Sequence, residues 1–235
     1  MNIGIIVAME RELEALRAAG VEGARLAGIG KVNAAMTATE MILKGRPDCI
    51  INSGVGGGLS PVLKAGDIVV GTSVAYHDVW CGEGNARGQV QGLPPRFDAD
   101  TRLVDAAREA CKGMPVGAGH AAGEALGHLP GGAVHFGLIA GGDEFVDNSA
   151  SEERIMGLYP DAIACDMESA AIAHVCHVYN VPFLCMRVVS DVAGAHTETY
   201  EGFWRDISEN SFAALKALLE QLRTAETAAL FSARG

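Results

Sequence analysis

The stretch Cys165–Gly194 constrains the fold more than any other part of the sequence. Its first part is rich in small and apolar residues and predicts a helix. Pro182 ends this helix, because proline has no backbone N–H donor and restricts the residue before it. Phe183–Val189 is then an almost unbroken apolar run, as expected for a strand covered on both faces. With the short strand Ala162–Asp166 before it, the unit is a strand, a helix and a buried strand in succession.

Each end of this unit carries an acid that packing does not require. Glu168 opens the helix and Asp191 follows the strand, and ligands of open α/β sheets bind outside the carboxyl ends of strands. Structural roles are the alternative, since an acid favours the start of a helix dipole and often caps a turn. Arg187 and Ser190 favour the functional interpretation. A buried arginine needs a partner, and this strand delivers three polar groups to one edge.

The whole chain alternates between predicted strands and helices. Its 235 residues are 49% apolar and 20% charged, which is enough for a sizeable core. We find no repeat, linker or shift in composition. The sequence therefore predicts a single domain over residues 1–223, a three-layer α/β/α fold with a mixed, largely parallel central sheet, followed by a flexible tail over residues 224–235.

Charge and cysteine usage exclude several classes of protein. A net charge of −11 argues against nucleic acid or an anionic membrane as a partner. The N-terminus reads as a first strand rather than a signal peptide, and no apolar run is long enough to span a membrane. The six cysteines form no CxxC pair, so we expect buried thiols in a cytoplasmic protein. His174 and His177 lack further ligands and are interpreted as packing or surface residues, so no metal is expected.

Two further junctions offer ligand-facing groups. Glu12 lies in the first helical turn after the strand Asn2–Val7, whereas its acidic neighbours are interpreted as solvated. Gly28–Lys31 opens the next helix and can cradle an anion on its amides. Without the third glycine of a dinucleotide fingerprint, we discount NAD and expect no cofactor.

Three loops are also candidates. Four glycines lie within Gly54–Gly58, so the backbone there passes close to a ligand or to a neighbouring strand, and we favour the ligand. The irregular segment Val79–Arg96 is long enough to be functional or part of an interface. Phe145 lies in a glycine-rich loop, where its ring can stack on a flat base or pack back onto the core.

Together these motifs resemble the nucleoside phosphorylase/hydrolase superfamily, and within it the methylthioadenosine/S-adenosylhomocysteine nucleosidases. The resemblance covers nearly the whole chain, and the order and spacing of the motifs make it specific. The motifs are GIIVAMERE (Gly4–Glu12), GIGKVNAA (Gly28–Ala35), INSGVGGG (Ile51–Gly58), GDIVV (Gly66–Val70), YHD (Tyr76–Asp78), GGDEFV (Gly141–Val146), DMESAAIAHV (Asp166–Val175) and RVVSDVA (Arg187–Ala193).

The resemblance implies a hydrolase that cleaves the N-glycosidic bond of 5′-thioadenosines and releases adenine. Asp191, helped by Ser190, would be the general acid at N7 of adenine. Glu12 would deprotonate the attacking water, with Arg187 nearby, and Glu168 would hold the ribose hydroxyls. Asp191 must then keep a proton near neutral pH, so its pKa should be raised, whereas Glu12 must stay ionised.

The family's pocket supplies the remaining expectations. A homodimer is expected, because a partner subunit completes the family's pocket. At position 55 the family often has serine or threonine, and at position 200 a phenylalanine, so the 5′ group is the least constrained part of the substrate. The expected binding residues are Met9, Ile29, Val55, Phe145, Val146, Met167 and Tyr200.

Three other functions stay open at this point. A purine nucleoside phosphorylase needs cations for phosphate, and the glycine-rich loops offer only Lys31, so hydrolysis ranks higher. A futalosine or aminofutalosine hydrolase would use the same machinery with another 5′ group, which Val55, Tyr200 and Trp80 keep possible. A catalytically silent nucleoside-binding protein is the third, and retention of all three acids weighs against it.

Overall fold

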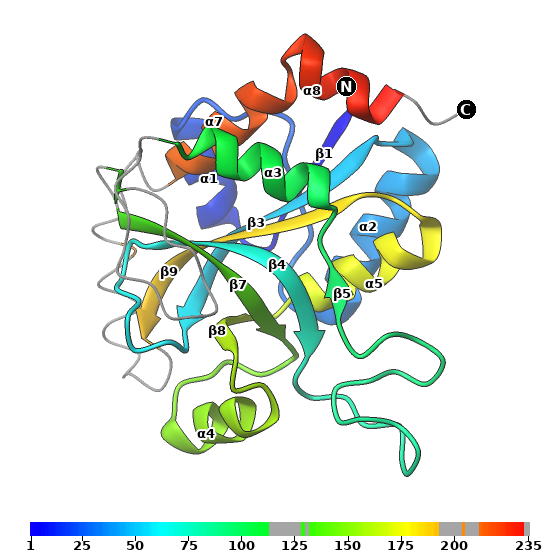
Figure 1. Ribbon diagram of the computed structural model, residues 1–235, viewed down its shortest axis with the longest axis vertical. Coiled ribbons are helices and arrows are strands. Elements are labelled where there is room, and N and C mark those ends of the chain that lie inside the picture. The colour runs from blue at the N-terminus through cyan, green and yellow to red at the C-terminus, as the bar shows by residue number, and fades with distance from the viewer. Residues whose placement is uncertain (113–127, 130–131, 193–203, 205–211, 233–235) are drawn as a thin grey trace.

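The computed structural model describes residues 1–112, 128–129, 132–192, 204 and 212–232 (Figure 1). The strands are β1 (Ile3–Val7), β2 (Arg25–Leu26), β3 (Cys49–Gly58), β4 (Ile68–Tyr76), β5 (Phe97–Asp98), β6 (His128–Leu129), β7 (Gly132–Gly141), β8 (Ala162–Asp166) and β9 (Phe183–Val192). The helices are α1 (Glu10–Ala18), α2 (Lys31–Gly45), α3 (Thr101–Ala110), α4 (Ser149–Leu158), α5 (Ser169–Tyr179), α7 (Ala213–Leu222) and α8 (Ala225–Ser232). None of these helices is long and apolar enough to cross a bilayer.

The central sheet is mixed, with strand order β2-β1-β3-β8-β7-β4-β5. Strand β9 pairs in parallel with β3 and antiparallel with β4. Because β3 also reaches β4 through β8 and β7, these five strands form a closed ring of pairings. The predicted α/β class with a mixed central sheet is confirmed. The closed ring of strands distinguishes this sheet from an open one.

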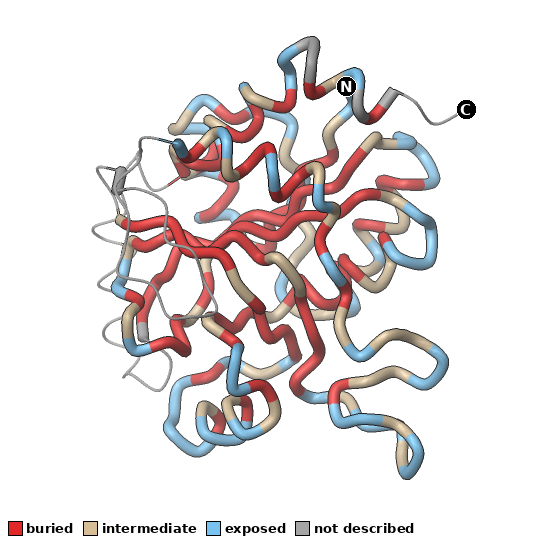
Figure 2. The backbone as a smooth tube through the Cα atoms, viewed as in Figure 1, coloured by how far each residue is buried: buried red, intermediate tan, exposed pale blue. Residues whose placement is uncertain are grey.

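Helices cover the sheet on two sides. In Figure 1, α1, α3, α7 and α8 lie on one side, and α2 and α5 lie on the other. Successive residues of β9 alternate between two apolar clusters: Leu184 and Met186 pack on the first side, and Phe183 and Cys185 on the second. The strands are therefore buried along most of their length, as Figure 2 shows, which explains the unbroken apolar run of β9.

Several boundaries differ from the sequence prediction. Strand β9 runs on to Val192, so Asp191 belongs to the strand instead of following it. Strand β3 continues through the glycine stretch to Gly58. The segment expected to be a flexible tail contains α8, whose Phe231 is buried in the core and has the guanidinium of Arg102 4.3 Å from its ring centre. Through Phe231, α8 packs on the core, so this segment is not the free tail that the sequence predicted.

Candidate active site

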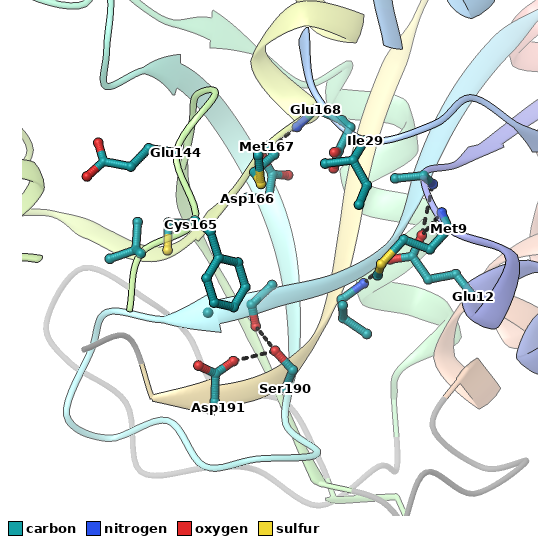
Figure 3. A pocket seen from close by; sticks show the side chains of 16 residues that line it. Met9, Glu12, Ile29, Glu144, Cys165, Asp166, Met167, Glu168, Ser190 and Asp191 are labelled. Carbon is teal, nitrogen blue, oxygen red and sulfur yellow. Dashed lines mark hydrogen bonds between the residues drawn. The ribbon is translucent and has the colours of Figure 1, made fainter. Parts of the chain in front are cut away.

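A pocket opens where β1, β3, β8 and β9 end and the loop after β7 begins (Figure 3). Every predicted site residue within the described ranges lines this pocket except Arg187, and Tyr200 lies outside those ranges. The lining residues are Ala8, Met9, Glu12, Ile29, Val55, Gly56, Gly57, Glu144, Phe145, Val146, Cys165, Asp166, Met167, Glu168, Ser190 and Asp191.

The carboxylate of Glu12 is held by three backbone N–H groups. Its Oε2 accepts from Ala8 (2.8 Å) and Met9 (2.9 Å), and its Oε1 accepts from Val55 (2.8 Å). Burial raises the pKa of Glu12, while the charge of Arg187 and the three N–H donors oppose this rise. The three donors require acceptor oxygens and so favour the ionised form, but burial outweighs them and the net shift of the pKa is upward.

Glycines in β3 make room for Glu12 and for the neighbouring strands. A Cβ at Gly54, whose φ is +152°, would lie 2.3 Å from Oε1 of Glu12. A Cβ at Gly56 would lie 2.7 Å from the carbonyl oxygen of Cys165. We expected the glycines chiefly to face a ligand. Gly56 also lines the pocket, but close packing of protein atoms already requires glycine at both positions.

A β-bulge brings Ser190 and Asp191 together into the pocket. The pairing of β3 with β9 passes from Gly56–Val189 to Gly57–Asp191, so Ser190 is an extra residue. Its Oγ lies 2.5 Å from Oδ1 of Asp191 and 3.3 Å from the carbonyl oxygen of Gly56. With that second acceptor available, the hydroxyl can donate to an ionised Asp191 or accept from a protonated one.

The protonation expected for Asp191 agrees with its surroundings. Burial raises the pKa of Asp191, and the hydroxyl of Ser190 lowers it in part. The side chain is 6% exposed, and Ser190 supplies no positive charge to hold the ionised form. The pocket therefore favours a neutral carboxyl at this position more than water does.

Glu168 occupies the N-cap position of α5, yet its side chain makes no capping bond. Its Oε1 accepts a hydrogen bond from the backbone N–H of Gly30 (3.0 Å), and its Oε2 lies 3.7 Å from Nη2 of Arg187. Burial raises the pKa of Glu168 to about 7, against the charge of Arg187 and with the charge of Asp166 adding to it. The sequence left open a helix-dipole role for Glu168, but its side chain bonds Gly30 and approaches Arg187 in place of the first amides of α5.

Arg187 lies beneath the pocket floor and is 1% exposed. Its Nε donates to Oδ2 of Asp166 (2.8 Å), and its Nη2 donates to Oδ1 of Asn52 (2.5 Å). Its Nη1 is buried and has no hydrogen-bond partner within the described part of the chain. We predicted a partner for this arginine without identifying one. The signal was present, because Asn52 and Asp166 are polar residues in otherwise apolar strands.

Both histidines of α5 contact Phe97, and His177 is exposed, in agreement with the prediction of packing or surface residues. His174 Nδ1 lies 3.1 Å from the hydroxyl of Tyr76, and its ring stacks on Phe97 with centroids 5.5 Å apart. The ring of His177 tilts against Phe97 at 5.6 Å. No cluster of three or more histidine, cysteine or acidic side chains within the described ranges has the geometry to hold a metal ion.

Comparison with known proteins agrees with this geometry. A family model described as the Phosphorylase superfamily matches residues 19–220. The 5′-methylthioadenosine/S-adenosylhomocysteine nucleosidase of Anoxybacillus flavithermus is 37% identical, over 94% of this chain and 99% of its own length. The chain belongs to the phosphorylase superfamily, in its nucleosidase branch. The resemblance seen in the motifs is thereby confirmed.

Solved structures extend the comparison within this superfamily. The nucleosidase of Neisseria meningitidis, in complex with methylthio-immucillin-A, matches with a TM-score of 0.81 and 35% identity, covering 94% of this chain and 99% of that one. Futalosine hydrolase of Helicobacter pylori matches with a TM-score of 0.79 and 25% identity, covering 94% and 97%. The superfamily fold is therefore shared by enzymes named for different nucleosides.

The raised pKa of Glu168 predicts a pH-dependent contribution to stability. The folded state binds more protons than the unfolded state between about pH 4.5 and pH 7, so this contribution is present below that window and lost as the pH rises through it. Replacing Glu168 by Gln removes the dependence. From pH 5 to pH 8, the unfolding free energy of Glu168→Gln should rise relative to wild type by about 1–3 kcal/mol, measured by urea denaturation.

Met167→Leu is the matched control, because it changes the same pocket without removing a carboxyl group. Its difference from wild type should be equal at the two pH values. An equally constant difference for Glu168→Gln would contradict the assignment of a raised pKa to this side chain.

Proposed function

We propose that this chain hydrolyses the N-glycosidic bond of 5′-methylthioadenosine and of S-adenosylhomocysteine, releasing adenine. The observation that carries the proposal is the placement of two differently supported acids around one cavity. Asp191 and Ser190 face it from the end of β9, and Glu12 faces it from α1 (Figure 3). Relatives named as nucleosidases of these substrates include one solved with methylthio-immucillin-A and one with adenine.

Asp191 is proposed as the general acid. Adenine is a poor leaving group as an anion, and protonation at N7 lets it depart neutral. A carboxyl whose pKa is raised by burial carries that proton nearer to neutral pH, and Ser190 holds its Oδ1. Phe145, 47% exposed at the pocket, is proposed to stack on the purine, and the backbone of Val146 to contact its edge.

Glu12 is proposed as the base that deprotonates water. As adenine departs, the sugar develops positive charge, as in glycoside hydrolysis, and nearby carboxylates stabilise that charge. The buried cation of Arg187 counters the rise in the pKa of Glu12 and so favours its ionised form. Glu168 is proposed to hold the ribose hydroxyls, and the remaining sugar-side contacts are assigned to Met9, Ile29, Met167 and Tyr200.

Hydrolysis is favoured over phosphorolysis by the charges of the pocket. Its described lining contains no lysine or arginine, whereas a phosphate ion needs cationic or N–H donors. Lys31, the one cation of the glycine-rich loops, has its ammonium 2.6 Å from Oδ2 of Asp78. Phosphate in this cavity would face Glu12 and Glu168, and the nearest guanidinium, that of Arg187, is buried beneath the floor and bonded to Asp166 and Asn52.

Futalosine-type hydrolysis is the second candidate, supported by the match to the H. pylori enzyme. Val55 lines the pocket where the nucleosidases often carry a hydroxyl, so one polar contact to the substrate is absent. The reaction at the glycosidic bond would be unchanged. Only the group attached at the 5′ carbon would differ.

A substrate panel separates these functions. Methylthioadenosine, S-adenosylhomocysteine, aminofutalosine and inosine are offered with and without phosphate, and base release is followed. We expect phosphate-independent release of adenine from the first two. Preference for aminofutalosine would support the second candidate, phosphate dependence would support a phosphorylase, and no release from any of them would leave a binding protein.

The two acids predict separate losses of turnover. Asp191→Asn and Glu12→Gln should each lower kcat by at least about 10²-fold, because each removes a proton-transfer group. Glu10→Gln is the control for Glu12, since it lies exposed in the same first turn of α1. Near-wild-type turnover in either variant would remove that residue from the mechanism.

A homodimer is proposed from the outer face of α2. Val32, Met36 and Leu43 lie on one face of this helix, and all are more than 60% exposed. An apolar stripe of this kind is typical of an interface.

Sedimentation should show a dimer that Met36→Glu weakens. Ala18→Glu, at an exposed position of α1, should leave the dimer intact. A fully active wild-type monomer would contradict the proposal.

A reducing, cytoplasmic location is proposed from the thiols. All six cysteines are unpaired, and five of them are buried. Burial raises the pKa of Cys49 to about 12, which keeps its thiol protonated and unreactive. Disulfide-bonded proteins of oxidising compartments do not show this pattern.

A further inference from the structure

We propose that Lys31, Asp78 and Asp143 form a clasp between two loops of the pocket. The clasp joins Gly28–Lys31, the sugar-side loop, to Gly142–Val146, the base-side loop. In this view, Lys31 is a positioning residue for nucleoside binding rather than an anion ligand. The assignment rests on the proposed function for its substrate. The claim that the clasp orders the two loops rests only on contacts within the protein and does not depend on the substrate.

The clasp joins three segments that are distant in sequence. The Lys31 ammonium lies 2.6 Å from Oδ2 of Asp78 and 3.8 Å from Oδ2 of Asp143. The backbone N–H of Lys31 donates to Oδ1 of Asp143 (2.7 Å), and that of Asp143 donates to Oδ2 of Asp78 (2.8 Å). Each member therefore contacts both of the others.

Two of these segments carry pocket residues beside the clasp. Ile29 lines the pocket two residues before Lys31, and the N–H of Gly30 holds Glu168. Phe145 lines it two residues after Asp143. The loops meet so closely that a Cβ at Gly30, whose φ is +96°, would lie 2.9 Å from Oδ1 of Asp143. A shift of either loop would thus change the spacing between sugar and base contacts.

The third segment, at the end of β4, serves as the anchor. Besides Asp78, the carbonyl oxygen of His77 accepts a hydrogen bond from Nη1 of Arg154 (2.8 Å). Nη2 of Arg154 pairs with Glu144, which also accepts from the hydroxyl of Ser151. The base-side loop is therefore tied to the same turn at two successive residues, which leaves Lys31 as the tie that adds the sugar-side loop.

Charge explains why a cation is needed at position 31. Burial alone would raise the pKa of Asp78, but the hydrogen bonds from Lys31 and from the N–H of Asp143 lower it below its usual value. Asp78 is thus ionised, beside the carboxylate of Asp143. Without the ammonium group between them, these two carboxylates repel, and the backbone hydrogen bond from residue 31 to Asp143 has to hold the loops together against that repulsion.

The clasp should affect binding more than chemistry. Glu12 is fixed by amides that directly follow β1 and by one in β3, and Asp191 by the bulge of β9, so neither depends on Lys31. Ordering the two loops before the ligand arrives lowers the entropic cost of binding. Loss of the clasp is therefore expected to raise KM while kcat stays nearly constant.

The test compares Lys31→Met with Lys44→Met, which removes an exposed lysine from the same helix. For Lys31→Met we expect KM for methylthioadenosine and Kd for adenine to rise about tenfold, or about 1.4 kcal/mol, with kcat within about threefold of wild type. Adding Asp143→Asn to Lys31→Met should cause no further loss, because the repulsion is relieved. Lys44→Met should match wild type throughout.

Hydrogen–deuterium exchange of the ligand-free protein provides a readout that needs no substrate. Amides of Gly28–Lys31 and Gly142–Val146 should exchange faster in Lys31→Met and at the wild-type rate in Lys44→Met. Unchanged exchange, or a loss confined to kcat, would overturn the clasp. If wild type fails to cleave methylthioadenosine, the proposed function falls, while the exchange result still decides whether the clasp exists.

Discussion

One buried ion pair, between Arg187 and Asp166, supports the whole site. Removing both charges from water is costly, and the close hydrogen bonds that Arg187 donates to Asp166 offset that cost. The pair joins β9 to β8 at the floor of the cavity, and Asn52 adds β3 to the same contact. Three strands of the closed ring are thereby fixed to one another where the chemistry is proposed to occur.

This arrangement gives three carboxyl groups in one cavity different characters. Glu12 is buried, yet it receives three backbone N–H donors and the field of Arg187. Glu168 feels the same cation but also the like charge of Asp166. Asp191 is held by a hydroxyl alone and has no cation among the contributions to its shifted pKa. Differences in hydrogen bonding and distance from one arginine thus separate groups that are chemically alike.

The sequence was most informative where polar residues lie at the ends of apolar strands and in the first turns of helices. Asp191, Glu168 and Glu12 were found in this way, because a carboxyl at a strand end or first helical turn has few packing reasons to be there. The same logic could have found Asp166. It could not find the clasp of Lys31, since surface charges meet through tertiary contacts that no local pattern encodes. The ring closure also depends on pairing between distant strands and stayed invisible for that reason.

The bulge at Ser190 has a consequence for how this strand can vary. Alternation along a strand would send adjacent side chains to opposite faces, and the extra residue cancels that alternation at one point. Deleting Ser190 would restore a regular ladder, with Asp191 still opposite Gly57 but without the neighbouring hydroxyl. The hydroxyl and the carboxyl therefore meet in one cavity because β9 carries one residue more than its partner strand.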